Sequence, residues 1–112
     1  MADRVELTVQ QAVRTGVTPT YNSASANNNT FANDGHTIIE VKNTSGSPIN
    51  VTIETPGTVD GNAVADLVVA VPATSGDKII GPFPPSIYNQ TGGVIYLDWS
   101  ATTNVTVAVI RV

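Results

Sequence analysis

Stiff, β-branched side chains dominate this sequence: Val, Ile and Thr supply 16, 9 and 15 of its 112 residues, against 3 Leu and 1 Met. Branching at Cβ restricts χ1 and suits a pleated sheet better than a helix. The chain is 41% hydrophobic with a net charge of -4, a balance that permits a packed core and excludes disorder along the whole length. We therefore expect an all-β protein, and a helical bundle is excluded.

Alternating apolar and polar residues indicate about seven short strands. They lie at residues 5–9, 36–42, 49–54, 67–71, 77–80, 94–99 and 105–112. Turn signals recur roughly every 8–12 residues between them, which is typical of a sandwich or a small barrel. We predict a single domain over residues 1–112, an antiparallel β-sandwich of seven to eight strands. Alternation alone leaves the jelly-roll and immunoglobulin-like types equally open.

The strongest hairpin signal joins the strands at 36–42 and 49–54 through the polar segment 43–48. Asp60-Gly61 predicts a second tight turn, and no segment has a helical period, although 62–67 has room for one turn. The last strand is expected to be paired as far as Val112. Ile95, Leu97 and Trp99 are predicted to face the core. In two other strands alternation places three apolar residues on one face: Ile49, Val51 and Ile53 in the first, and Val105, Val107 and Val109 in the second.

Two segments have the composition of binding surfaces. Residues 18–35 are small and polar, and we predict a long loop that is functional or ordered by a partner. Residues 83–88, Phe-Pro-Pro-Ser-Ile-Tyr, are apolar but too rich in Pro for a sheet interior. Such a stiff loop either covers the end of the core or binds a partner at little entropic cost. The candidate interface residues are Tyr21, Phe31, Phe83, Pro84, Pro85 and Tyr88.

Residues for catalysis or metal binding are scarce. The chain has no Cys and one His, His36, and no Gly-x-Ser-x-Gly elbow, so neither a nucleophilic triad nor an imidazole or thiolate metal site is expected. Its nine Asp and Glu are dispersed, and the Asp60-Gly61-Asn62 segment with Asp66 is interpreted as a β-turn rather than a calcium loop. We predict no catalytic, metal or cofactor-binding residues, and hence no enzyme.

Charge and hydropathy also argue against two classes of partner. Five basic residues are scattered through a chain of pI about 4.5, so no nucleic-acid footprint is expected. The longest apolar run, 67–73, is too short to cross a bilayer, and residues 1–6 alternate in charge unlike a signal peptide. A small Cys-free β domain fits a reducing compartment, or assembly inside a cell before release.

Residues 51–61, 80–89 and 94–98 resemble small virion proteins of tailed bacteriophages, and the Val/Thr/Asn/Gly-rich, Cys-free, mildly acidic composition resembles the head decoration, or cement, proteins. The resemblance implies a structural virion protein, assembled in the host cytoplasm, that stabilises the phage head by binding its outer surface. It also implies the major capsid protein or other virion proteins as partners, and a homo-oligomer, commonly a trimer. It carries no diagnostic motif and assigns no site residues.

Two alternatives remain open. A head–tail connector or tail-associated subunit would keep the fold and replace the threefold arrangement by a ring. A carbohydrate-binding or adhesin module would need an exposed aromatic platform, whereas Tyr96 and Trp99 fall on opposite faces of their predicted strand.

Overall fold

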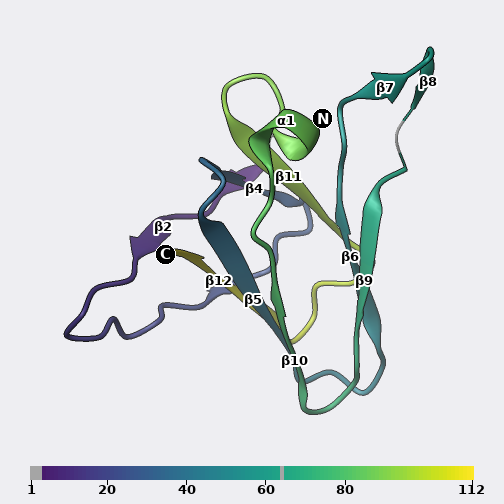
Figure 1. Cartoon of the computed structure of the whole chain (residues 1–112). Coiled ribbons are helices and arrows are strands. Elements are labelled where there is room, and N and C mark those ends of the chain that lie inside the picture. Colours follow the sequence, from purple (N-terminus) through teal and green to yellow (C-terminus); the bar gives the residue numbers. More distant parts are fainter. Residues whose placement is uncertain (1–3, 64) are drawn as a thin grey trace.

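The computed structural model describes residues 4–63 and 65–112, and this part of the chain is almost entirely β, as predicted (Figure 1). It extends over 41 × 36 × 25 Å. The elements are β1 Val5–Glu6, β2 Val9–Gln11, β3 Asn22–Ser23, β4 Asn29–Ala32, β5 Thr37–Asn43, β6 Ile49–Ile53, β7 Thr58–Val59, β8 Asn62–Ala63, β9 Leu67–Val71, β10 Gly76–Ile80, α1 Pro85–Tyr88, β11 Val94–Trp99 and β12 Val105–Arg111.

Two larger sheets contain most of the strands. The first has the order β1-β4-β11-β6-β9, and the second has the order β10-β5-β12-β2, with β3 also paired to β12. The antiparallel pairs are nested in the sequence: β4 with β11, β5 with β10, β6 with β9, and β7 with β8. Because β1 pairs with β4 and β2 with β12 in parallel, both sheets are mixed, and the prediction of a purely antiparallel fold is wrong.

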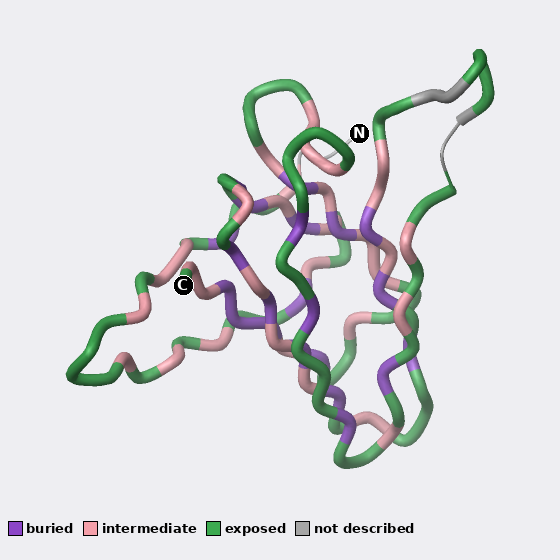
Figure 2. The backbone as a smooth tube through the Cα atoms, viewed as in Figure 1, coloured by how far each residue is buried: buried purple, intermediate pink, exposed green. Residues whose placement is uncertain are grey.

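The core lies between the two larger sheets and follows the predicted alternation. Inward-facing residues of β4, β5, β6, β11 and β12 form one hydrophobic cluster, and Figure 2 shows the buried segments along these strands. Ile95 and Leu97 belong to this cluster as predicted, and Trp99 packs against it but is only half-buried. The apolar faces of the strands at 49–54 and 105–112 also belong to the cluster. Fully buried members with less than 2% exposure include Ile39, Val41, Val51, Ile53, Ile95, Leu97, Val107 and Val109.

The predicted hairpin between residues 36–42 and 49–54 is wrong, although both strands exist. β5 pairs with β10 and β12, whereas β6 pairs with β9 and β11, so the two strands lie in different sheets. The buried Asn43 side chain holds the connection: its Nδ2 donates to the carbonyls of Ser47 (2.9 Å) and Pro72 (3.1 Å), and its Oδ1 accepts from the amide of Ser45. The chain thereby passes from one sheet to the other instead of folding back on itself.

The segment 18–35 is not the plain loop that its composition predicts. It contains β3 and β4, and Asn29 and Phe31 of β4 are buried. The predicted strand at 5–9 is likewise divided into β1 and β2, which join different sheets on either side of the buried Leu7. Short polar strands of this kind are fixed by their neighbours in the sheet rather than by their own composition.

The remaining predictions concern turns and ends. Asp60-Gly61 makes the β7–β8 turn, with positive φ at both residues, as predicted. β12 ends one residue early, but the amide of Val112 still donates to the carbonyl of His36 (2.9 Å). The one-turn helix α1 was not predicted, and the turn suggested at 62–67 includes residue 64, which lies outside the described residues. Nowhere in residues 4–63 and 65–112 is there a helix long and apolar enough to span a membrane.

Candidate interaction surface

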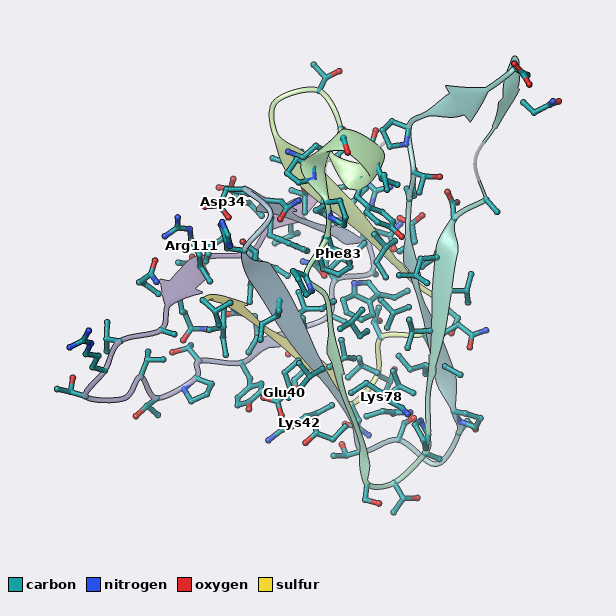
Figure 3. The ribbon with its side chains drawn as sticks, in the orientation of Figure 1. Asp34, Glu40, Lys42, Lys78, Phe83 and Arg111 are labelled. Carbon is teal, nitrogen blue, oxygen red and sulfur yellow. The ribbon has the colours of Figure 1, made fainter. Side chains whose placement is uncertain are left out.

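The segment that contains α1 is fixed to the body by an aromatic anchor. Phe83 is 1% exposed, and its ring centroid lies 6.1 Å from that of Phe31, which is fully buried, and 5.7 Å from that of Tyr88. Figure 3 shows Phe83 directed into the centre of the molecule. Phe31 and Phe83 are therefore core residues, and the prediction that their side chains form an interface is wrong. Pro keeps the segment out of the sheets, but a Phe ring has a large apolar area to bury.

Two asparagines fix the same segment from the other side. Asn33 Nδ2 donates to the carbonyl of Phe83 (3.0 Å) and to Asn89 Oδ1 (2.7 Å). Asn89 Nδ2 returns a bond to the carbonyl of Asn33 (3.1 Å). The reciprocal pair joins the chain after α1 to the turn between β4 and β5, and it satisfies the amide of Asn33, which is 7% exposed.

The outer side of the segment is apolar and open. Pro84, Pro85 and Ile87 are exposed, with Ile87 at 45%. Pro85 also lies against Gly35, where even an added Cβ would come within 3.2 Å of the proline ring. We call Pro84, Pro85 and Ile87 the α1 surface. Its backbone is held at both ends, so its side chains are presented with little conformational freedom left to lose on binding.

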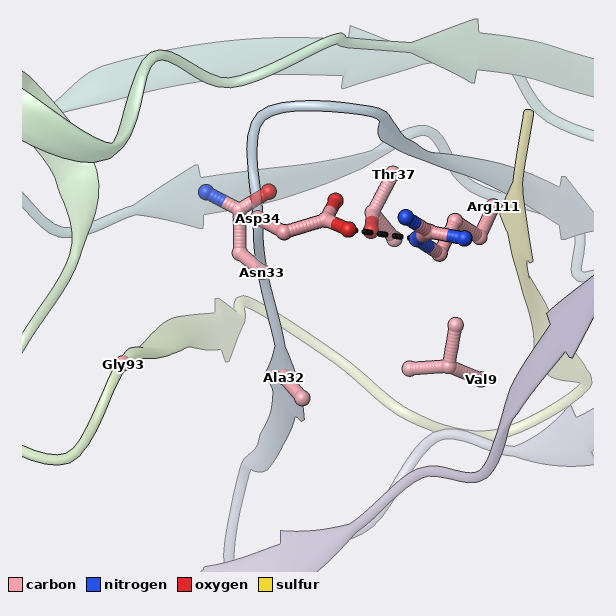
Figure 4. A pocket seen from close by; sticks show the side chains of 7 residues that line it. All are labelled: Val9, Ala32, Asn33, Asp34, Thr37, Gly93 and Arg111. Atoms are coloured by element: carbon pink, nitrogen blue, oxygen red, sulfur yellow. Dashed lines mark hydrogen bonds and ion pairs between the residues drawn. The ribbon is translucent and has the colours of Figure 1, made fainter.

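A depression of about 250 Å³ lies beside the turn between β4 and β5 (Figure 4). Val9 and Ala32 form part of its wall, and Asp34 and Arg111 form an ion pair at its rim. Arg111 Nη1 also donates to Gln11 Oε1 (2.7 Å), so the guanidinium already has partners. The pKa of Asp34 is held below its usual value, mainly by the hydrogen bond from the Arg111 side chain and secondly by the hydrogen bond from the His36 amide. The carboxylate is thus ionised and paired at neutral pH, which makes it unsuitable as a proton donor.

A second cluster of charges joins the start of the chain to the outer face of the first sheet. Arg4 contacts Glu54 Oε2 at 2.6 Å and Asp98 Oδ1 at 2.7 Å, and its guanidinium lies 4.3 Å from the centre of the Tyr96 ring. Hydrogen bonding to Asp98, then burial, raises the pKa of Glu54. Asp98 Oδ1 is buried and takes part in the ion pair with Arg4. Arg4, Glu54 and Asp98 are not among the residues that line the depression, and their ion pairs hold the segment before β1 against the sheet.

Sequence reasoning missed this carboxylate pair because Glu54 and Asp98 are 44 positions apart and nothing local connects them. Their strands are neighbours in the sheet, and the amide of Glu54 donates to the carbonyl of Tyr96 (3.1 Å). Only the outward alternation of β6 and β11 could have placed both on one face.

The other candidate residues lie apart from the α1 surface. The Tyr21 hydroxyl donates to Glu40 Oε1 (2.6 Å), a bond that raises the pKa of Tyr21, and the Lys42 ammonium lies 4.4 Å from its ring centre. Tyr21 is therefore pinned to the outer face of the second sheet. Of the six candidates, Pro84 and Pro85 are exposed together, and Tyr88 is half-buried beside them.

No protein-family model, curated protein or solved structure matches this chain. Within the described ranges, no three His, Asp or Glu side chains come together as metal ligands would.

Proposed function

We propose that this chain is a structural subunit that attaches to a protein shell through its α1 surface. The observation that carries the proposal is the combination of a rigid anchor and an open apolar side in one short segment. Phe83 and the Asn33–Asn89 pair fix the backbone, while Pro84, Pro85 and Ile87 face outward. A backbone that is already rigid lowers the entropic cost of binding for the apolar side chains that it presents.

The fold we propose is a jelly roll rather than an immunoglobulin-like sandwich. The support is the nesting of β4 with β11, β5 with β10, β6 with β9 and β7 with β8. A long hairpin rolled into two sheets produces this order, whereas the immunoglobulin arrangement does not nest all of its strands. Jelly rolls occur in viral capsid and lectin domains, which is an argument by analogy and does not by itself assign a function.

The shell we propose is a phage head, with the major capsid protein as the partner. This part rests on the resemblance of residues 51–61, 80–89 and 94–98 to phage virion proteins. A head–tail connector or tail-associated subunit is the alternative, and it would use the same surface in a ring.

The carbohydrate-binding alternative receives less support from the aromatic side chains. The Tyr96 ring is covered on one face by Arg4, and Trp99 donates its Nε1 hydrogen to Asn29 Oδ1 (2.8 Å) and packs against the core. A flat sugar-binding platform requires aromatic faces that are free.

Cosedimentation tests the proposal. Purified protein is mixed with phage heads that lack it, and the bound fraction is measured for the wild type, for Ile87→Asp and for Val13→Asp. Val13 is a matched control because it is 53% exposed and lies in the connection between β2 and β3. A charge in an apolar contact should weaken binding by at least about tenfold for Ile87→Asp, and Val13→Asp should bind as the wild type does. No binding by the wild type, or equal binding by Ile87→Asp, would overturn the proposal.

A further inference from the structure

The strand β9 forms an open edge of the first sheet and has an unusual composition for that position. Its sequence is Leu-Val-Val-Ala-Val, and β6 is the one strand with which its described residues pair. Val68 is 55% exposed, Ala70 is exposed, and Leu67 and Val69 are only half-buried although they face the core. An apolar edge strand without charges is a site at which another strand can add.

Alternate residues of β6 direct their backbone groups toward β11 and toward β9, and this alternation decides which backbone groups of β9 are free. Asn50 directs both of its groups toward β11, because its amide donates to Ser100 Oγ (2.8 Å) and its carbonyl accepts from the Ser100 amide (3.1 Å). Ala70 is opposite Asn50, and Val68 is opposite Thr52 two residues along. Asn50–Ala70 and Thr52–Val68 are therefore non-hydrogen-bonded pairs, in which both residues direct their backbone N–H and C=O groups away from the partner strand. The N–H and C=O groups of Val68 and Ala70 therefore face the open edge.

The other edges are protected by the devices that proteins commonly use. β1, β2 and β3 are only two, three and two residues long and offer few free groups. β10 has the same length as β9, but it carries Asp77 and Lys78. Lys78 is opposite the buried Val41 and shares the core-side face of β10 with the buried Gly76 and Ile80, but at this edge its side chain is exposed. A charge in this position opposes the addition of a strand.

We propose that β9 is a self-association edge at which two copies of this chain pair antiparallel around a twofold axis at Val69. In this register Val68 of one protomer is opposite Ala70 of its partner, and each such pair exchanges both of its hydrogen bonds. The two Val69 side chains meet on the core side, and Leu67 is opposite Val71. The paired residues are all apolar, so no like charges meet along the seam.

A second copy is the favoured occupant because the strand is complementary to itself. The register needs no charge or special side chain from the partner, and it covers the half-exposed Leu67 and Val69 of both protomers with one interface. The interface is small, so a dissociation constant in the micromolar range or weaker is expected. This inference does not rest on the proposed function, and the dimer differs from the trimer that the phage resemblance implies.

Light scattering and sedimentation over a dilution series, from about 1 mM to 1 µM, test the proposal. The wild type should approach twice the chain mass of 11.6 kDa at high concentration. Ala70→Pro removes an amide hydrogen that β6 does not use and should raise the dissociation constant by at least about tenfold. The matched control is Ile79→Pro in β10, whose amide also faces an open edge and which should leave the dimer unchanged.

Val68→Lys keeps the test decisive if the proline variant does not fold. Its side chain is exposed in the protomer, so the fold should tolerate it, and the edge then carries a charge. A wild type that is monomeric throughout, or that is trimeric, would overturn the proposal. Equal association of the wild type and Val68→Lys would do the same.

Discussion

The strands β9 and β10 follow one another in the chain, have five residues each and form open edges of different sheets. Each leaves the backbone groups of two alternate residues free: Val68 and Ala70 in β9, and Asp77 and Ile79 in β10. For β10 this follows from the hydrogen bonds of β12. The Val105 carbonyl accepts from the Ala24 amide, on the side of β12 away from β5, so Asn43, which is opposite Val105, directs its backbone groups toward Gly76 of β10. At the centre of a twofold pairing, β9 would place Val69 against Val69, and β10 would place Lys78 against Lys78. Side chains, and not backbone geometry, thus distinguish an adhesive edge from a protected one.

The two edges are linked by a tightly packed corner, residues 72–76, between the end of β9 and the start of β10. A Cβ on Gly76, the first residue of β10, would lie 1.9 Å from the carbonyl oxygen of Pro72. The Asn43 side chain bonds to the same carbonyl (3.1 Å). The corner sets the position of both edges at once.

Disrupting this corner should destabilise the protein more than any other change considered. Gly76→Ala forces the backbone of Pro72 to move, and we expect a loss of about 3 kcal/mol in the free energy of unfolding. Urea denaturation followed by circular dichroism measures it. Gly46→Ala is the control, since an added Cβ there meets nothing within 4 Å, and its stability should stay within about 0.5 kcal/mol of the wild type. Equal midpoints for the two variants would show that the corner is not rigid.

A change of intermediate size should make the two edges alike. Lys78→Val removes the core-side charge from β10, so this edge should also associate, with a gain of about tenfold in affinity over the wild-type edge. A protomer with two twofold seams continues into an open chain, and light scattering should therefore detect masses beyond the dimer. Lys78→Arg keeps the charge and serves as the control. A Lys78→Val protein that stops at the dimer would mean that Lys78 is not what protects β10.

Glu54 should make a modest contribution to the pH dependence of stability. Interaction with Asp98 and burial raise the pKa of Glu54 above its ordinary value of 4.5, so the folded state binds this proton more tightly than the unfolded state does. The resulting stabilisation is present below pH 4.5 and is lost as the pH rises through the folded-state pKa.

In Glu54→Gln this part of the pH dependence should disappear, and the free energy of unfolding should change by under about 1 kcal/mol. Urea midpoints at acid and neutral pH measure it, with Asp60→Asn in the β7–β8 turn as the control. The dimer edge should not respond, because β9 has no titratable side chain. An unchanged pH dependence in Glu54→Gln would show that Glu54 does not contribute to the pH dependence of stability.

The sequence predicted the faces of the strands better than their neighbours. β9 and β11 were predicted with the bounds that the structure has, since Pro72 ends one and Gly93 precedes the other. Alternation identifies the side of a strand that is buried, but the same pattern fits any partner strand. For this reason the pairing of residues 36–42 with 49–54 was predicted wrongly.

The candidate site was predicted only in part, for a related reason. Pro84 and Pro85 are exposed as expected, but composition could not distinguish Phe83, which points inward, from Ile87, which points outward. In irregular segments no period relates position to direction. The open edge of β9 also escaped prediction, because an edge is a property of the strand order.

Hydrogen exchange at the free backbone groups is the sharpest test of β9 as the self-association edge. The amides of Val68 and Ala70 should exchange fast in dilute protein and become protected as the concentration rises, while the amides of Asp77 and Ile79 exchange fast throughout. Exchange of Val68 and Ala70 that does not depend on concentration, or protection that appears at Ile79 instead, would contradict the assignment of β9 as the self-association edge.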